Sequence, residues 1–507
     1  MEAFVIRRFL CLRLFSLFFR SLLLFTGFCA DTSVNDSLLN LVFRDSPTTQ
    51  IGAGYWSMPS VFLKTYGCQM NERDTEQVAR DLLDRGYERA ETEQDADVIL
   101  LNTCSVRDLA EQKALRKMSN LKALRKKNPA LVLGFLGCMA QRKGESLEKE
   151  MKGLDLVVGT QKFHRVADLV GEAREARLGG RPRFFAEVGE EEGSEKTIRD
   201  HILAPKQVTA FVSVMQGCDM HCSFCIVPTT RGKERSRPIS EIVSEVRGLV
   251  EKGVREVTLL GQIVNMYGRR QIPTVRGKTA FVQLLEELQA VDGLDRIRFT
   301  SPHPRGMKDD LIGCYGRLSK LCEHLHLPVQ SGSDRLLKEM GRGYTVEQYR
   351  KIVEKVRQAC PGIGLTTDVI VGYPGETEEE FQSTYKLMEE VEFDNGFIFR
   401  YSPREGTRAA KSGGNEVPEA TKESWNRSLL DLLDRQVAVS SPRRIGSLTE
   451  ILVEGRSKTN ENRLTGRSRQ NRPVVFDGGA RHLGQLLMVR IVESTGFTDY
   501  ADPAILE

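Results

Sequence analysis

Short apolar runs alternate with helix-like stretches in the part of the chain that follows residue 57. The runs that read as strands are residues 60–66 (SVFLKTY), 96–101 (ADVILL), 131–136 (LVLGFL) and 153–159 (GLDLVVG). Residues 72–85 and 107–127 lie between them and read as helices. Strands that alternate with helices predict a small parallel α/β domain over residues 59–175. Residues 172–196, rich in Gly, Glu and Arg, are predicted to form a linker or a hairpin.

A longer alternation of the same kind begins near residue 207. Six strands are expected, at residues 209–216, 256–262, 296–301, 324–329, 364–371 and 396–401. The helical segments between them include residues 239–252, 281–291, 346–358 and 378–391. Six β/α units predict an incomplete (β/α)6 barrel over residues 204–436, with its chemistry on the loops at the carboxyl ends of the strands.

The last region, residues 440–507, follows a helix expected at residues 419–437. Its short β-like runs, at residues 449–453, 473–476 and 486–492, alternate with glycines and predict a small β-barrel. Residues 443–472 contain eight basic residues and three acids. The basic residues are 443, 444, 456, 458, 463, 467, 469 and 472. This excess suits contact with nucleic-acid phosphates, and a solvated basic face is the alternative.

The first 57 residues differ in composition from the rest. Residues 1–30 carry four arginines, one acid and an apolar run at 21–28 that is shorter than the roughly 20 residues of a membrane span. A secretory signal, a mitochondrial presequence and a start codon placed upstream of the true start at Met58 are the three alternatives. We treat residues 1–57 as a leader outside the folded core.

Overall composition limits the classes of function. The 507 residues suffice for two to four domains, and 73 basic against 69 acidic residues give a net charge of only +4. Any nucleic-acid surface must therefore be local. Eleven cysteines are an odd number in a long chain, which disfavours a disulfide framework and suits a reducing compartment where thiolates hold metal.

Three cysteines stand close together in the stretch GCDMHCSFC. Cys218, Cys222 and Cys225 have the spacing C-x3-C-x2-C, which suits an iron–sulfur cluster because soft iron prefers thiolates from one tight loop. Three protein ligands would leave one iron of a four-iron cluster open to substrate. A zinc knuckle and three packed thiols are the alternatives, and His221 inside the loop is expected to face solvent or to lie behind the ligands.

Three further cysteines each follow a predicted strand. Cys68, Cys104 and Cys138 come just past the carboxyl ends of the first three strands, at the edge where open α/β sheets bind ligands. Each alone could be a packed thiol, but packing does not explain why all three share this edge. We therefore predict a second cluster held by three cysteines. The remaining candidates for such chemistry, Cys314, Cys322 and Cys360, lie in helical context and are expected to be packing residues.

Polar loops rich in Gly and Pro end the strands of the central domain. They are residues 261–262 (GQ), 301–304 (SPHP), 328–332 (PVQSG) and 372–376 (GYPGE). Each could be an ordinary loop, but their repetition on one face favours a ligand site, because glycine allows the backbone to approach a ligand closely.

These motifs resemble a known family. TYGCQMN (65–71), NTCSVR (102–107), LGCMAQ (136–141) and GCDMHCSFCIVPTTRGKERSRP (217–238) are similar to the radical S-adenosylmethionine methylthiotransferases of the MiaB type. The likeness covers nearly the whole chain from Met58. It implies an N-terminal methylthiotransferase domain, a radical S-adenosylmethionine core and an RNA-binding TRAM domain. Gln69-Met70-Asn71 after the first cysteine favours the branch that acts on isopentenylated adenosine.

The resemblance implies two 4Fe-4S clusters and S-adenosylmethionine as cofactors. Cys218, Cys222 and Cys225 would hold the cluster that cleaves S-adenosylmethionine, and a second set would hold the cluster that delivers sulfur. That second set is Cys68, Cys104 and Cys138. Cofactor contacts are expected from Phe224, Gly261, Gln262, Gly372, Pro374, Gly375 and Glu376. The departures Ile263 and Met266 replace two residues that are polar in the family.

The implied reaction converts N6-isopentenyladenosine, next to the anticodon on its 3′ side, to its 2-methylthio derivative. Related activities on threonylcarbamoyl-adenosine or on a ribosomal protein are the alternatives, and a cluster-bearing RNA-binding protein without turnover is a third. The expected partners are the tRNA anticodon loop and a reductant of flavodoxin or ferredoxin type, with the sulfur donor unknown. Four basic residues could meet the anticodon-loop phosphates: Arg231, Lys233, Arg235 and Arg237. We expect a monomer in the cytoplasm, without a membrane segment, or in mitochondria if residues 1–57 are a presequence.

Overall fold

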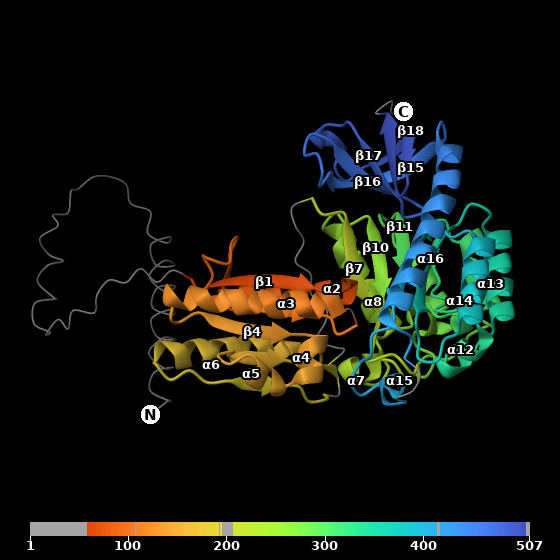
Figure 1. The fold of residues 1–507 in the computed structure, drawn as a ribbon. Coiled ribbons are helices and arrows are strands. Elements are labelled where there is room, and N and C mark those ends of the chain that lie inside the picture. The colour runs from red at the N-terminus through yellow and green to blue at the C-terminus, as the bar shows by residue number, and fades with distance from the viewer. Residues whose placement is uncertain (1–57, 107, 192, 195–205, 413–415, 503–507) are drawn as a thin grey trace, which may run out of the picture. The chain divides into compact units, whose positions relative to one another are not determined.

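The computed structural model describes residues 58–106, 108–191, 193–194, 206–412 and 416–502 (Figure 1). The predictions for the leader at residues 1–57 lie outside the described residues. The expected fold class is confirmed, because a parallel α/β domain, a partial β/α barrel and a small closed β-barrel follow one another along the chain. None of the helices among the described residues is both long and apolar enough to cross a membrane.

The N-terminal domain is built on a six-stranded parallel sheet of order β2-β1-β3-β4-β5-β6. The strands are β1 (Ser60–Tyr66), β2 (Glu88–Arg89), β3 (Val98–Thr103), β4 (Val132–Leu136), β5 (Leu156–Val158) and β6 (Phe185–Glu187). The helices are α2 (Gln69–Asp84), α3 (Asp108–Leu121), η1 (Lys122–Lys126), α4 (Cys138–Lys143), α5 (Ser146–Glu150), η2 (Phe163–Arg165) and α6 (Val166–Leu178). Successive residues of β3 enter hydrophobic clusters on opposite faces, because strand side chains alternate: Ile99 and Leu101 on one, Val98 and Leu100 on the other.

The linker or hairpin predicted at residues 172–196 is wrong for residues 172–178 and 185–187, which form a helix and a strand. Helix α6 runs through its first part, and β6 then pairs in parallel with β5 as the last strand of the sheet. The helix was missed because Gly, Glu and Arg dominate the composition. Val166, Leu169, Val170 and Ala173 are nevertheless buried at helical spacing, and that signal could have identified it.

The central domain has six β/α strands in two three-stranded parallel sheets, β11-β10-β7 and β12-β13-β14. The strands are β7 (Thr209–Ser213), β10 (Glu256–Leu260), β11 (Arg296–Phe299), β12 (His324–His326), β13 (Gly364–Val371) and β14 (Asn395–Arg400). A parallel bridge between Ile297 and Leu321 continues the succession from β11 toward β12. The predicted strand at 209–216 is divided, since β8 (Met215–Gln216) turns away from β7 to pair with β9 (Arg235–Ser236).

Helices of very different length connect these strands (Figure 1). They are α7 (Val227–Arg231), α8 (Ile239–Glu251), η4 (Val264–Met266), α9 (Ala280–Gln289), η5 (Pro304–Gly306), α10 (Asp309–Ile312), α11 (Cys314–Arg317), α12 (Asp334–Glu339), α13 (Val346–Ala359), α14 (Glu378–Val391), α15 (Arg408–Lys411) and α16 (Glu419–Ser440). Thr345 and Thr377 begin α13 and α14 with capping boxes, and both starts agree with the predicted ones.

The C-terminal domain is a closed barrel with the strand order β15-β16-β17-β19-β18. Its elements are η6 (Ser441–Arg444), β15 (Leu448–Arg456), β16 (Leu464–Ser468), β17 (Pro473–Phe476), η7 (Ala480–His482), β18 (Leu486–Thr495) and β19 (Thr498–Asp502). Strands β16 and β19 were not predicted, because they carry few apolar residues. They alternate buried and exposed positions instead, as strands of a small barrel do.

The barrel binds the amino ends of the central strands through two arginines of β11. Arg296 donates to Glu450 Oε1 at 2.8 Å and to the carbonyl oxygen of Arg467 at 2.7 Å. Arg298 donates to the carbonyl oxygen of Ser468 at 2.7 Å. The carboxyl ends of the central strands are therefore left for a ligand site.

We predict that Arg296→Ala destabilises the protein by about 2–3 kcal/mol, because Arg296 is fully buried and its removal leaves the Arg467 carbonyl without its donor and the partly exposed Glu450 without its partner. Urea unfolding measures this loss, and hydrogen exchange should show faster opening of β15 and β16. The control is Arg427→Ala, which breaks an exposed pair with Glu423 and should cost no more than about 1 kcal/mol. Equal losses in the two variants would contradict this account of the barrel's docking.

Candidate cluster and cofactor site

Cys68, Cys104 and Cys138 meet at the carboxyl edge of the N-terminal sheet. Strands β1, β3 and β4 are parallel neighbours and end in register, so the residue that follows each of them emerges at the same edge. The Cys104 amide donates to the Tyr66 carbonyl at 2.8 Å. The side chains of Cys68 and Cys104 share a hydrogen bond. The sequence prediction that these three cysteines share one edge is confirmed by their positions.

Two buried asparagines hold this edge together. Asn71 donates to Asn102 Oδ1 at 3.0 Å, and Asn102 donates back to the Asn71 carbonyl at 2.9 Å. The Cys68 thiol donates to Asn71 Oδ1 at 3.3 Å. Gly137 enters the same corner at a φ of 90°, where a Cβ would lie 2.1 Å from Asn102 Oδ1. Only glycine fits there, and both asparagines belong to the cysteine motifs, although sequence reasoning assigned them no role.

The electrostatics of the three thiols suit a metal. The hydrogen bond from Cys104 lowers the pKa of Cys68 and raises the pKa of Cys104. Burial raises the pKa of Cys138. Iron binds thiolates, so metal binding at this site must release protons from at least Cys104 and Cys138. A bound cation would then stabilise the negative charge of the buried thiolates.

The second group of thiols lies in the loop between β8 and α7. Gly217 opens the loop at a φ of 74°, where a Cβ would lie 2.0 Å from the Lys233 carbonyl oxygen. The Met220 amide then donates to Cys218 Sγ at 3.4 Å, and the Cys225 amide to the Cys222 carbonyl at 3.2 Å. Burial raises the pKa of Cys218 to about 11 and that of Cys225 to about 12. Metal binding would here again displace protons from buried thiols.

Arg342 is a buried residue that sequence reasoning missed. Its Nη1 donates to Cys222 Sγ at 3.7 Å and its Nη2 to the Pro328 carbonyl oxygen at 3.3 Å. No local pattern identifies it, because Arg342 reaches the cysteine loop from another part of the barrel.

Each donor set fits an iron–sulfur cluster. The three thiols of each group influence one another's pKa, and the nine cysteines of the described residues form no disulfide. Within the described part of the chain, no three His, Cys, Asp or Glu side chains are arranged to hold one metal ion. The thiolates of a cluster bind different irons, so they stand further apart than the ligands of a single ion.

The loop at residues 372–376 contacts the second cysteine loop. Ser223 and Tyr373 share a hydrogen bond of 2.9 Å, and Phe224 packs against the apolar cluster that contains Tyr373. Glu376 Oε2 accepts from the amides of Gly372 at 2.5 Å and Tyr373 at 3.1 Å. The structure thus brings together two stretches from which cofactor contacts were predicted, and it adds Tyr373 between them.

The loop that follows β10 lies over the same cysteines. Ile263 packs in one apolar cluster with Cys218 and Met220, and Met266 lies against that cluster. Gly261, just before this loop, is close to Met215, since a Cβ there would lie 2.6 Å from the Met215 side chain. The two departures from the family pattern are therefore apolar cover for Cys218.

Neighbouring strand-end loops are tied to one another. Asn265 donates to the His303 carbonyl at 2.9 Å and accepts from the His303 amide at 2.9 Å. Burial, with nearby Arg342, lowers the pKa of His303 to about 2, so this imidazole is neutral. The loops after β10 and β11 are consequently held as one rigid rim.

The prediction that the four basic residues after Cys225 meet tRNA phosphates is wrong for Arg231 and Arg237. Arg231 is buried and pairs with Asp74 at 2.6 Å, and Arg237 is buried and pairs with Glu245 at 2.6 Å. Arg235 donates to Gln161 at 2.8 Å, and Lys233 is exposed. These ion pairs desolvate the guanidinium groups, which phosphates can no longer reach.

Many basic residues of the stretch 443–472 in the C-terminal domain also form ion pairs with acidic side chains. Arg444 and Arg472 contact Asp499, and the other paired members are Arg463 with Asp477, Arg467 with Glu454 and Arg469 with Glu323. Arg443, Arg456 and Lys458 are exposed. The basic surface is therefore smaller than the sequence suggested.

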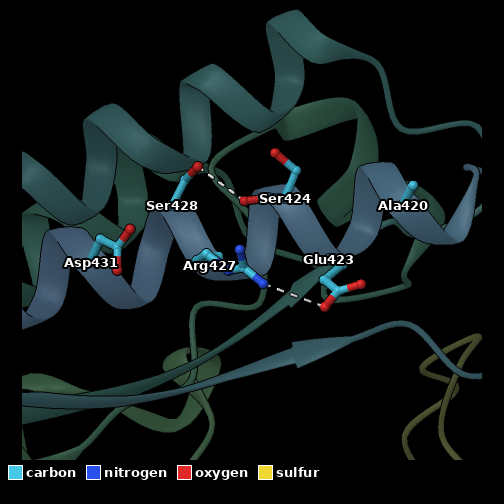
Figure 2. A pocket seen from close by; sticks show the side chains of 6 residues that line it. All are labelled: Ala420, Glu423, Ser424, Arg427, Ser428 and Asp431. Carbon is cyan, nitrogen blue, oxygen red and sulfur yellow. Dashed lines mark hydrogen bonds and ion pairs between the residues drawn. The ribbon is translucent and has the colours of Figure 1, made fainter.

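The three remaining cysteines of the described residues lie outside these two groups of thiols. Cys314, Cys322 and Cys360 are buried, which agrees with a packing role, and the His221 residue is exposed. A hollow on α16 has a volume of about 340 Å³. Figure 2 shows the six side chains that line it: Ala420, Glu423, Ser424, Arg427, Ser428 and Asp431. All six residues come from one helix, so this surface cannot enclose a ligand, and we assign it none.

Three known families match successive parts of the chain. They are the Uncharacterized protein family UPF0004 at residues 60–159, the Radical SAM superfamily at 212–388 and the TRAM domain at 442–503. A tRNA-2-methylthio-N(6)-dimethylallyladenosine synthase of Methylacidiphilum infernorum is 52% identical over 448 residues, which are 88% of this chain and 95% of the relative. This chain belongs to that synthase family. The synthase of Akkermansia muciniphila is 51% identical over 88% of this chain and 99% of its own length.

Membership of the synthase family confirms the resemblance expected from the motifs. An iron–sulfur cluster and S-adenosylmethionine are accordingly cofactors of this radical S-adenosylmethionine enzyme. A solved structure of the methyltransferase TsrM from Kitasatospora setae, with cobalamin and a 4Fe-4S cluster bound, is 14% identical with a TM-score of 0.50. It covers 70% of this chain and 77% of TsrM, and it supports the fold alone.

Glu376 generates a pH prediction. Burial raises the pKa of this carboxyl from its ordinary 4.5 to about 7, so between these values the folded chain binds more protons than the unfolded chain. The contribution of Glu376 to stability therefore falls as the pH rises through this window. Glu376→Gln should gain stability relative to the parent, by about 2 kcal/mol, between roughly pH 5.5 and pH 8. Thermal unfolding of both proteins at pH 5.5 and at pH 8 checks this prediction. A stability difference between them that does not change with pH would contradict it.

Proposed function

We propose that this enzyme converts N6-isopentenyladenosine, beside the anticodon of tRNA, to its 2-methylthio derivative, and that it uses two 4Fe-4S clusters. The observation that carries the proposal is the second group of thiols. A radical enzyme that only cleaves S-adenosylmethionine needs Cys218, Cys222 and Cys225. The convergence of Cys68, Cys104 and Cys138 at a separate sheet edge supports a second metal site, and sulfur insertion gives that site a purpose.

The groups at the second cysteine loop would hold and orient S-adenosylmethionine. Together, the cluster and S-adenosylmethionine supply a radical able to activate the inert C2–H bond of adenine. The residues proposed to contact this cofactor are Phe224, Gly261, Gln262, Gly372, Pro374, Gly375 and Glu376. Of these, Phe224 is fixed by the apolar cluster around Tyr373, and Glu376 fixes the turn at residues 372–376 through two backbone amides. The apolar cover made by Ile263 and Met266 would restrict access of water to Cys218.

The N-terminal thiols would hold the cluster from which sulfur reaches the base. The Asn71–Asn102 pair keeps the three strand ends in place, so the thiols are preorganised before metal binds. A product with a methylthio group at C2 then needs both groups of thiols. A one-electron donor of flavodoxin or ferredoxin type would serve the radical step.

The tRNA would be bound in part by the C-terminal barrel. Arg443, Arg456 and Lys458 are the exposed basic residues of its basic stretch, and exposed cations are the groups that contact phosphates. Lys233 is exposed beside the cysteine loop and could meet the anticodon loop there.

A matched pair of variants tests the proposed function. In anaerobically reconstituted enzyme with isopentenylated tRNA, Cys68→Ala should abolish the 2-methylthio product while cleavage of S-adenosylmethionine continues. Cys218→Ala should abolish both, because it removes the radical step itself. Mass spectrometry of digested tRNA and assay of 5′-deoxyadenosine give the two readouts. Full methylthio product from Cys68→Ala would refute the second cluster, and activity only on threonylcarbamoyl-adenosine would refute the substrate.

A further inference from the structure

One buried arginine connects the two groups of thiols. Arg231 is the last residue of α7, the short helix that begins just after Cys225. Its side chain is 4% exposed, and its Nη2 donates to Asp74 Oδ2 at 2.6 Å. Asp74 is fully buried on α2, the helix that begins just after Cys68. The elements that follow the two cysteine motifs are thus joined by a single buried ion pair.

The guanidinium is not satisfied by Asp74 alone. Nη1 of Arg231 is buried and has no hydrogen-bond partner among the described residues. The charge of this group acts on the thiols of Cys138 and Cys68, because it opposes the burial that raises the pKa of Cys138 and it helps to lower the pKa of Cys68. A buried donor without an acceptor is costly, whereas a thiolate or sulfide beside it would accept its hydrogen bond.

Other contacts already dock α7, and β9 just after it, on the N-terminal domain. Thr160 donates to the Thr230 carbonyl at 2.6 Å, and Arg235 donates to Gln161 at 2.8 Å. The charge of Arg231 is therefore not required merely to hold the two elements together. Its place beside two thiols needs another explanation.

We propose that Arg231 is a positioning residue of the N-terminal cluster. It orients the thiolates of Cys68 and Cys138, and its charge raises the reduction potential of that cluster. This inference rests on the proposed function, since it requires that cluster to form. Reduction adds one electron, and hence one negative charge, to the cluster. A fixed cation stabilises that charge strongly where water is excluded. The central domain would in this way tune a metal site whose ligands all belong to the N-terminal domain.

The test uses the full chain with Cys218, Cys222 and Cys225 all changed to Ala, so that only the N-terminal cluster titrates. Arg231→Gln removes the charge at similar length, and Arg231→Lys keeps it. Arg237→Gln is the matched control, because Arg237 is equally buried but pairs with Glu245 and with the Ser213 carbonyl. After reconstitution, iron is counted and the cluster is titrated with dithionite, which supplies the electron, under electron paramagnetic resonance.

We expect the midpoint potential to fall in Arg231→Gln and to stay near the parental value in Arg231→Lys and Arg237→Gln. An unchanged potential in Arg231→Gln, or an equal fall in Arg237→Gln, would overturn the proposal. If Arg231→Gln holds no iron, the Arg231→Lys variant tests the proposal instead. Parental iron content and midpoint potential in Arg231→Lys would support the role of the charge, and loss of either would overturn it. Absence of iron already in the parental background would instead overturn the proposed second cluster.

Discussion

The rest of this structure depends on one constraint, which is that parallel strands all end at the same edge of their sheet. In the N-terminal domain this rule brings Cys68, Cys104 and Cys138 together from positions far apart in the chain. In the central domain it gathers the loops that follow β10, β11 and β13. Each domain can therefore assemble a site from short motifs without any of them being close in sequence.

Buried arginines then fix the domains to one another. Arg231 reaches Asp74 of the N-terminal domain, and Arg296 reaches Glu450 of the C-terminal barrel. Each is an internal charge that is costly unless it is paired, so the geometry that pairs it is strongly favoured over alternatives that do not. The two contacts lie at opposite ends of the central strands, since α7 follows the carboxyl end of β7 and β8 whereas Arg296 begins β11. The barrel consequently leaves the thiol-bearing end free.

The features that the sequence predicted well are those with a local signal. The apolar runs of β1, β3, β4 and β13 mark strands. Gly-Cys or Thr-Cys after β1, β3 and β4 marks the edge of the N-terminal sheet. Strand ends were less well placed, because the chain leaves β12 at His326, before Pro328. The short strands β6, β16 and β19 were missed because they contain few apolar residues of their own. They are strands because they pair with neighbouring strands, which the sequence does not show.

The candidate site shows the same division. The cysteines could be found from spacing and position, whereas the roles of Arg231, Arg237 and Arg342 could not. A basic residue in a loop looks like a surface cation until its acidic partner, such as Asp74 far earlier in the chain, is placed beside it. The error about phosphate contacts arose because charge is visible in a sequence and burial of that charge is not.

The central claim is that the chain holds two clusters, and an iron count tests it most directly. The protein begun at Met58 should be purified anaerobically, reconstituted and compared with a variant in which Cys68, Cys104 and Cys138 are all changed to Ala. About eight irons per chain falling to about four is the predicted result. About four irons in both proteins would contradict the account, because the N-terminal thiols would then hold no cluster.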